Sequence, residues 1–171
     1  MRLGLTPSQT VGPFFSHALT WPDGPVVDDG PESFWLCGTV FDGAGALVTD
    51  AIVETWQPDA LGRFNHPGFR GYGRSTTDDH GRWGVRTVLP GGVPAPDGRE
   101  QAPHIDLSVF ARGLLDRVVT RVYFADSTVE DPVLSALPAS RRETLLARRS
   151  ADGYEFDIRL QGERETVFFG I

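Results

Sequence analysis

The stretch Ala102-Pro-His-Ile-Asp-Leu-Ser-Val-Phe-Ala-Arg-Gly113 decides the fold of this chain. Every second side chain in its centre is apolar, and side chains that alternate along a strand point to the same face of a sheet. We therefore predict a half-buried strand, and its core face consists of Ile105, Leu107, Val109 and Ala111.

The opposite face of this strand carries His104, Asp106, Ser108, Phe110 and Arg112. Such a row has two interpretations. It is a functional surface, which means the wall of a site or an interface, or it is the ordinary alternation of a solvated strand. His104 and Asp106 also have the spacing of two ligands in a ferrous site of two His and one carboxylate. The second His of such a site normally comes well downstream, and no His follows His104. A ferrous site is therefore disfavoured.

The length of the chain favours one folded domain over residues 1–171, because 171 residues suffice for a single sizeable core. The formal net charge is -7 and no basic run is dense enough to follow phosphates, so nucleic acid is not an expected partner. Cys37 is the only cysteine, which excludes a disulfide within the chain. We find no signal pattern and no run of about 18 apolar residues, and we expect a cytoplasmic protein without membrane contact.

Turn residues separate the short apolar runs of this chain. The 20 Gly and 13 Pro are distributed in the way that is typical of an all-β protein. A hairpin should join the strand described above to an apolar, β-branched strand at 118–124 across Gly113–Arg117. The predicted architecture is a two-sheet β-sandwich over residues 33–171. Alternation predicts its other strands at 33–41, 51–57, 82–88, 154–160 and 166–169.

One short helix is predicted near the C-terminus, over Pro138–Ser150. Ser140 and Glu143 have the spacing of a reciprocal capping box, and Leu145 and Leu146 give the helix a small apolar face.

An N-terminal arm and loop are expected over residues 1–32. The segment Thr6–Phe15 has neither helical nor strand periodicity, and its two prolines and Gly12 fix a bent path. Its two phenylalanines would be costly to leave in water, since burying an aromatic ring contributes on the order of 2 kcal/mol. The arm is therefore expected to dock, either on its own domain or on a partner.

Several motifs recur in this order in one family of enzymes. They are Thr6-Pro-Ser-Gln-Thr-Val-Gly-Pro-Phe14, Gly38-Thr-Val-Phe-Asp-Gly-Ala-Gly45, Val53-Glu-Thr-Trp-Gln57, Thr77-Asp78 with Gly81, and Ala102-Pro-His-Ile-Asp106 before Phe110-Ala-Arg-Gly113. With these motifs the chain resembles the intradiol ring-cleaving dioxygenases from about Thr6 to its C-terminus. The resemblance implies a β-sandwich of that family's type and a reaction that opens a catechol ring with both atoms of O2.

The iron site of that family is incomplete here. Catalytic chains of the family hold a ferric ion with two Tyr and two His, because hard phenolate oxygens stabilise the ferric state. Their His-x-His pair aligns with His104 and Asp106. One of their tyrosines falls near Val93, and the other belongs to a stretch between Phe64 and Gly73 that is short in this chain. The resemblance therefore implies a vestigial site, with no iron bound by this chain.

The same resemblance implies a division of labour between two chains. Fe(III) would belong to a homologous iron-binding β subunit, and this chain would complete the shared active site in a higher αβ oligomer. The implied substrate is 3,4-dihydroxybenzoate, which is opened to 3-carboxy-cis,cis-muconate, and no residue of this chain would be catalytic. The implied substrate-binding residues are Thr10, Gly12, Pro13 and Phe14 of the arm, and Arg112, whose guanidinium would attract and orient the anionic catechol.

A second interpretation stays open. The pattern Gly-x-Val-x-Asp, a small turn, Ala-x-Val and Thr-Asp-x-x-Gly also resembles transthyretin-like β-sandwich modules, which only bind or brace. Such a module would explain the sheet, but it would explain neither the Thr6-Pro-Ser-Gln-Thr10 arm nor Arg112.

Overall fold

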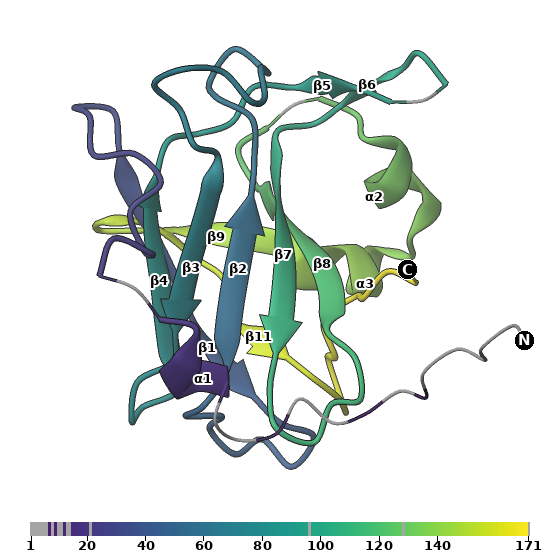
Figure 1. The fold of residues 1–171 in the computed structure, drawn as a ribbon. Coiled ribbons are helices and arrows are strands. Elements are labelled where there is room, and N and C mark those ends of the chain that lie inside the picture. Colours follow the sequence, from purple (N-terminus) through teal and green to yellow (C-terminus); the bar gives the residue numbers. More distant parts are fainter. Residues whose placement is uncertain are drawn as a thin grey trace, which may run out of the picture.

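The computed structural model describes residues 7, 9, 12, 15–20, 22–95, 97–127 and 129–170. Strands dominate these residues and the helices are short (Figure 1), which confirms the prediction of a mostly β protein. The strands are β1 (Phe34–Phe41), β2 (Ile52–Trp56), β3 (Tyr72–Thr76), β4 (Arg82–Thr87), β5 (Val93–Pro94), β6 (Glu100–Gln101), β7 (His104–Phe110), β8 (Val118–Phe124), β9 (Leu146–Ser150), β10 (Gly153–Glu155) and β11 (Ile158–Arg159). The helices are α1 (Phe15–Ala18), α2 (Pro132–Ala136), α3 (Ala139–Arg142) and the 3-10 helix η1 (Glu143–Leu145).

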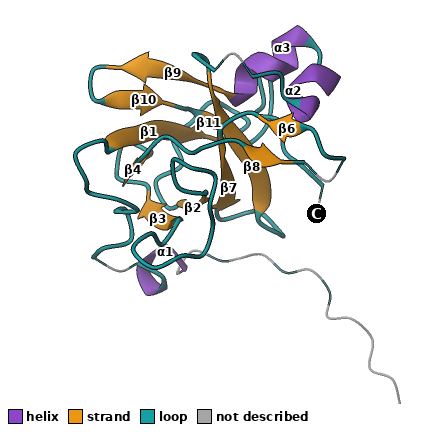
Figure 2. Cartoon of the chain, turned by 90° about the horizontal axis from the view of Figure 1, so that it is seen from above, coloured by secondary structure: helices purple, strands orange, loops and turns teal. Residues whose placement is uncertain are grey.

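Within the described residues nine strands form one continuous sheet. Its order is β11-β1-β10-β9-β8-β7-β2-β3, and β4 pairs with β1. β3 and β4 lie side by side in Figure 1, and the Gly84 N–H donates a hydrogen bond to Ser75 Oγ between them, at 3.1 Å. The sheet therefore bends round until its ends nearly meet, as the view from above shows (Figure 2).

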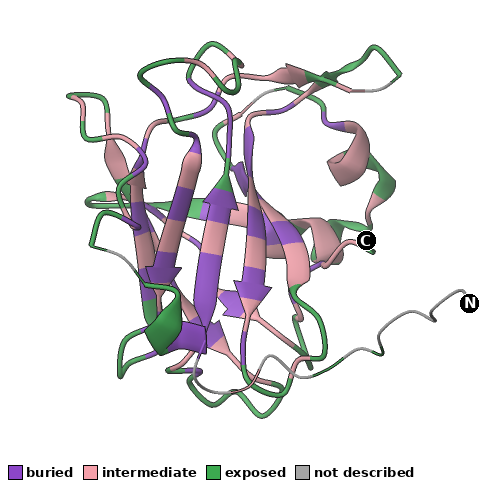
Figure 3. Cartoon of the chain, viewed as in Figure 1, coloured by how far each residue is buried: buried purple, intermediate pink, exposed green. Residues whose placement is uncertain are grey.

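The predicted strand of residues 102–113 corresponds to β7, and its alternation is confirmed. The side chains of Ile105, Leu107, Val109 and Ala111 have no exposed surface, whereas Asp106, Ser108 and Phe110 are half-buried. Figure 3 shows the same alternation of buried and intermediate positions along the neighbouring strands. The apolar faces of the strands enclose one main core, which includes Leu36, Val40, Val53, Val85, Val122 and Phe124.

The predicted hairpin of β7 and β8 is also confirmed. Its register places Tyr123 opposite His104, and Arg121 opposite Asp106. Because side chains directly opposite each other in an antiparallel pair lie on the same face, these four side chains lie together on the outer face of the sheet. The register of the hairpin thus assembles most of the site described below.

β1 lies between strands from distant parts of the chain. It pairs antiparallel with β4 and parallel with β10 and β11. The Thr39 N–H donates to the carboxylate of Asp157, 118 positions later, at 3.0 Å. Gly38 permits this close approach, because a Cβ at this position would clash with the backbone carbonyl of Phe156.

The predicted helix over 138–150 is wrong in its second half. Helix α3 ends at Arg142, η1 continues to Leu145, and β9 begins at Leu146. Ser140 does not cap α3, because the N-cap position is Pro138 and has no side-chain cap. β9 pairs in parallel with β8 and antiparallel with β10, so its backbone groups find partners on two other strands. Helix α2 also precedes α3, so the expectation of one short helix near the C-terminus is corrected.

The helices of the described chain are all short. Among them, none is both long enough and apolar enough to cross a membrane. α2 and α3 lie beside β8 and β9 at one side of the curved sheet (Figure 2). There they cover a small second core, made of Ala102, Tyr123, Leu145 and Val167.

Candidate functional site

His104 opens β7 and is almost entirely buried, with 7% of its surface exposed. Its Nδ1 donates a hydrogen bond to the carbonyl of Ala102 at 2.8 Å, which directs Nε2 toward the Asp106 carboxylate, 4.0 Å away. Burial lowers the pKa of His104 below its ordinary value. The ring is therefore held neutral and in a fixed orientation.

Arg121 of β8 lies at the centre of this site. Its Nε donates to Asp106 Oδ1 at 2.9 Å, and its Nη1 donates to Gln101 Oε1 at 2.8 Å and to Tyr123 Oη at 3.3 Å. Burial disfavours its charge, but the hydrogen bond to Tyr123 and the negative charge of Asp106 outweigh burial and raise the pKa of the guanidinium. Arg121 is thus a partly buried permanent cation.

Tyr123 and Asp131 extend the network toward α2. The Tyr123 hydroxyl donates to Asp131 Oδ1 at 3.1 Å, and burial raises the pKa of Tyr123 well above its ordinary value. Asp131 Oδ1 also accepts from the first backbone N–H groups of α2, whereas its Oδ2 accepts from Ala102 N at 3.0 Å. We refer to Gln101, His104, Asp106, Arg121, Tyr123 and Asp131 as the Arg121 cluster.

The Arg121 cluster does not fit a ferric site of two Tyr and two His. It contains one imidazole, and its single phenol is committed to Asp131 and Arg121. The Asp106 carboxylate is already paired with the Arg121 guanidinium, and the His104 Nε2 lies 4.0 Å from that same carboxylate. Among the described residues, no three His, Cys, Asp or Glu side chains lie close enough together to hold a metal ion.

Sequence reasoning identified His104 and Asp106 but missed Arg121, Tyr123 and Asp131. The predicted hairpin contained part of the signal. Once its register is set, alternate residues of β8 necessarily lie opposite alternate residues of β7. Asp131 had no such signal, because it comes from the N-cap of a helix that was not predicted.

Removing the Asp131 carboxylate is expected to destabilise the fold substantially. Its side chain is 2% exposed and accepts hydrogen bonds from Tyr123, Ala102, Val133 and Leu134. Asp131→Ala removes an N-cap and leaves buried donors unpaired, which should cost about 2 to 4 kcal/mol. For a domain of this size, we expect the midpoint of thermal unfolding to fall by about 5 to 15 °C.

Asp116→Ala is the matched comparison, because Asp116 is exposed in the hairpin loop. Circular dichroism melts of both variants measure the difference. Equal midpoints for the two variants would contradict the structural role of Asp131.

Arg112 lies beyond the end of β7, at the opposite end of this strand from His104. Its side chain is 66% exposed, and its Nε forms an ion pair with Asp50 Oδ2 at 3.2 Å. Asp50 comes from the segment before β2 and is largely covered, with 18% of its side chain exposed. The structure therefore does not bring Arg112 and the Arg121 cluster together, and Asp50 orients an otherwise accessible guanidinium.

The predicted substrate-binding residues of the arm are only partly covered by the structure. Thr10, Pro13 and Phe14 lie outside the described residues. Gly12 has a φ of 80°, which is a left-handed backbone conformation that favours glycine, and a Cβ there would meet no atom within 4 Å.

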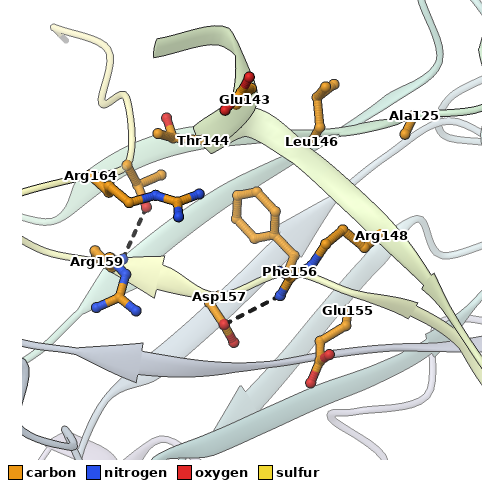
Figure 4. A pocket seen from close by; sticks show the side chains of 11 residues that line it. Ala125, Glu143, Thr144, Leu146, Arg148, Glu155, Phe156, Asp157, Arg159 and Arg164 are labelled. Atoms are coloured by element: carbon orange, nitrogen blue, oxygen red, sulfur yellow. Dashed lines mark hydrogen bonds and ion pairs between the residues drawn. The ribbon is translucent and has the colours of Figure 1, made fainter. Parts of the chain in front are cut away.

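Two hollows of the described surface contain neither His104 nor Arg112. A cavity of about 340 Å³ lies between η1, β9 and the β10–β11 segment, with Phe156 in its wall (Figure 4). Arginines and carboxylates line it in equal number, and Arg148 and Asp157 pair at 3.6 Å, so its charge favours neither anions nor cations. A shallower hollow of about 490 Å³ is lined by Val26, Val27, His66, Gly68, Phe69 and Arg70.

A family described as "Dioxygenase" matches residues 12–162. The chain is 40% identical to the protocatechuate 3,4-dioxygenase alpha chain of Burkholderia cepacia, over 97% of each chain. It is 43% identical to the alpha chain of the same name from Pseudomonas putida, over 96% of this chain and 95% of the relative.

A beta chain is also a relative. The protocatechuate 3,4-dioxygenase beta chain of Burkholderia cepacia is 34% identical over 79% of this chain and 67% of its own length. Among solved structures, the dioxygenase domain of a carbohydrate-binding fusion protein from Streptomyces sp. SirexAA-E superposes with a TM-score of 0.61 at 26% identity, over 92% of this chain and 98% of that domain. Catechol 1,2-dioxygenase from Acinetobacter sp. ADP1 shares the fold, with a TM-score of 0.60 at 21% identity over 80% of this chain and 56% of that protein.

Proposed function

This chain belongs to the dioxygenase family, and from that premise we propose that it is the α subunit of an intradiol dioxygenase that acts on 3,4-dihydroxybenzoate. In company with a homologous β subunit, it takes part in opening the ring to 3-carboxy-cis,cis-muconate with both atoms of O2. The observation that carries the proposal is the identity of 40% and 43% to two alpha chains over nearly the full length of both partners.

The iron of the enzyme belongs to the β subunit in this proposal. The Arg121 cluster supports that assignment, because its carboxylate is already paired with a guanidinium and its imidazole is directed at that carboxylate. The similarity of this chain to a beta chain, at 34% identity, supports an origin of both subunits from one iron-binding ancestor. When bound by the β subunit, the ferric ion would supply the coordination of the catechol.

The proposed contribution of this chain is to bind and orient the substrate. Arg112 offers an exposed cation that Asp50 holds in place, and the substrate carries a carboxylate. A planar guanidinium can bind a carboxylate through two parallel hydrogen bonds and thereby fix the orientation of the ring. Thr10, Gly12, Pro13 and Phe14 of the arm would line the same cavity, and the left-handed φ of Gly12 is compatible with the bent path expected there.

The finer architecture is also part of this proposal. The strand pairs β3-β2-β7-β8 and β4-β1-β10-β9 would form the two layers of a sandwich over residues 33–171 within one domain, with residues 1–32 as arm and loop. A cytoplasmic location and a higher αβ oligomer are proposed with it. A module that only binds or braces would not account for the extent of the similarity to the alpha chains.

Expression with and without the β subunit tests the proposal. The chain alone should show no ring opening of 3,4-dihydroxybenzoate and no visible iron-tyrosinate absorption, whereas the copurified complex should show both. Metal analysis after separation of the two chains should find the iron with the β subunit. Ring opening by this chain alone, or iron retained by it, would refute the division of labour.

A further inference from the structure

The guanidinium of Arg121 is surrounded by acceptors that converge on it. Asp106 Oδ1 lies 2.9 Å from Nε, Gln101 Oε1 lies 2.8 Å from Nη1, and the Tyr123 hydroxyl lies 3.3 Å from Nη1. The guanidinium carbon also lies over the ring of Phe169, 5.8 Å from the ring centroid. Strands β6, β7 and β8 therefore meet at one positive charge.

The donor set around this charge is one that divalent metals accept. Asp106 and Gln101 direct a carboxylate oxygen and an amide oxygen at the guanidinium, and the His104 Nε2 lies 4.0 Å from the same carboxylate. Imidazole and carboxylate are ordinary zinc ligands, and carbonyl oxygens bind divalent cations. His104 is already oriented by its hydrogen bond to Ala102, as the imidazole ligands of metal sites usually are. The cluster is thus organised like a cation site whose cation is a side chain.

We propose that the Arg121 guanidinium is a built-in replacement for a metal ion, which joins β6, β7 and β8 and keeps external cations out of the site. A permanent positive charge within hydrogen-bond distance of Asp106 and Gln101 repels a second cation and occupies two of its ligand positions. Removal of the guanidinium alone should therefore create a metal site that the natural chain lacks.

Zinc binding by the full-length chain tests it. Wild-type chain, Arg121→Ala, Arg121→Lys and the exposed charge-matched variant Arg117→Ala are dialysed against micromolar Zn2+ and analysed for bound metal. We expect Arg121→Ala to gain about one Zn2+ per chain over wild type, and Arg121→Lys and Arg117→Ala to gain none. In the presence of Co2+ instead of Zn2+, Arg121→Ala should show visible ligand-field absorption that the other chains lack.

A second substitution identifies the ligands. His104→Ala added to Arg121→Ala should abolish the gained Zn2+, which separates this site from the other His and Asp side chains of the surface. If Arg121→Ala does not fold, as judged by circular dichroism, Arg121→Ser and Arg121→Gln remove the same charge with a polar side chain in its place. Folded neutral variants that bind no more Zn2+ than wild type would overturn the proposal, as would Zn2+ bound by the wild-type chain and lost in His104→Ala.

Discussion

Replacing Arg112 with Ala is expected to raise the KM of the assembled αβ enzyme for 3,4-dihydroxybenzoate about 10- to 100-fold. Hydrogen bonds to a charged group contribute about 1.5 to 3 kcal/mol, which corresponds to this range. The effect on the fold should be small, because the Arg112 side chain is 66% exposed and pairs with Asp50 at the surface. Steady-state kinetics of the wild-type and variant enzymes measure the change.

Two comparisons assign the effect to recognition of the carboxylate. Catechol has no carboxylate, so any turnover of catechol should respond little to Arg112→Ala. Asp50→Asn leaves the guanidinium in place and removes only its charged partner, and it should therefore change KM much less. An equal loss for both catechols would assign Arg112 to structure, and an unchanged KM for 3,4-dihydroxybenzoate would remove it from the proposed pocket.

Among the glycines of the described chain, Gly38 should be the one at which the addition of a methyl group, by Gly38→Ala, destabilises the fold most. The added Cβ would lie inside van der Waals contact of the Phe156 carbonyl oxygen and 3.0 Å from the indole nitrogen of Trp83. The first of these atoms belongs to the backbone that links β10 to β11, and the Phe156 N–H donates to the Cys37 carbonyl of β1 at 2.8 Å. Relief therefore requires β1 and the β10–β11 segment to separate. We expect a loss of more than about 4 kcal/mol in the free energy of unfolding, or no folded protein at all.

Gly170→Ala is the corresponding comparison, because a Cβ at Gly170 would meet no atom within 4 Å. It should leave the free energy of unfolding within about 0.5 kcal/mol of wild type. Urea titrations followed by tryptophan fluorescence measure both variants. A Gly38→Ala chain as stable as Gly170→Ala would show that β1 does not pass as close to Phe156 as described.

Local patterns were sufficient to predict β7 and its hairpin partner. Ile105, Leu107 and Val109 alternate with polar residues, and Gly113 supplies a turn with a φ of 87°. Both signals lie within a short stretch, so they can be recognised without knowledge of the rest of the chain. The same locality explains the confirmed prediction of a mostly β protein.

Long-range pairing was not predictable in the same way. The capping-box spacing of Ser140 and Glu143 is a genuine local helix signal, but Leu146 and Ala147 instead pair with Tyr123 and Phe124. In so short a segment, a helix and a strand would show the same apolar residues. Only the free edge of β8 decides between helix and strand. For the site, His104 and Asp106 were recognisable as residue types, but the central position of Arg121 depends on the register of two strands.

The placement of β1 has a consequence for biosynthesis. Thr39 reaches a partner 118 positions later in the chain, and ribosomes add roughly 5 to 20 residues per second. The first strand therefore emerges roughly 6 to 24 s before the segment that completes its hydrogen bonding. During that interval the edge of β1 that later pairs with β10 and β11 is open to the strands of other nascent chains, so slow synthesis favours aggregation over folding.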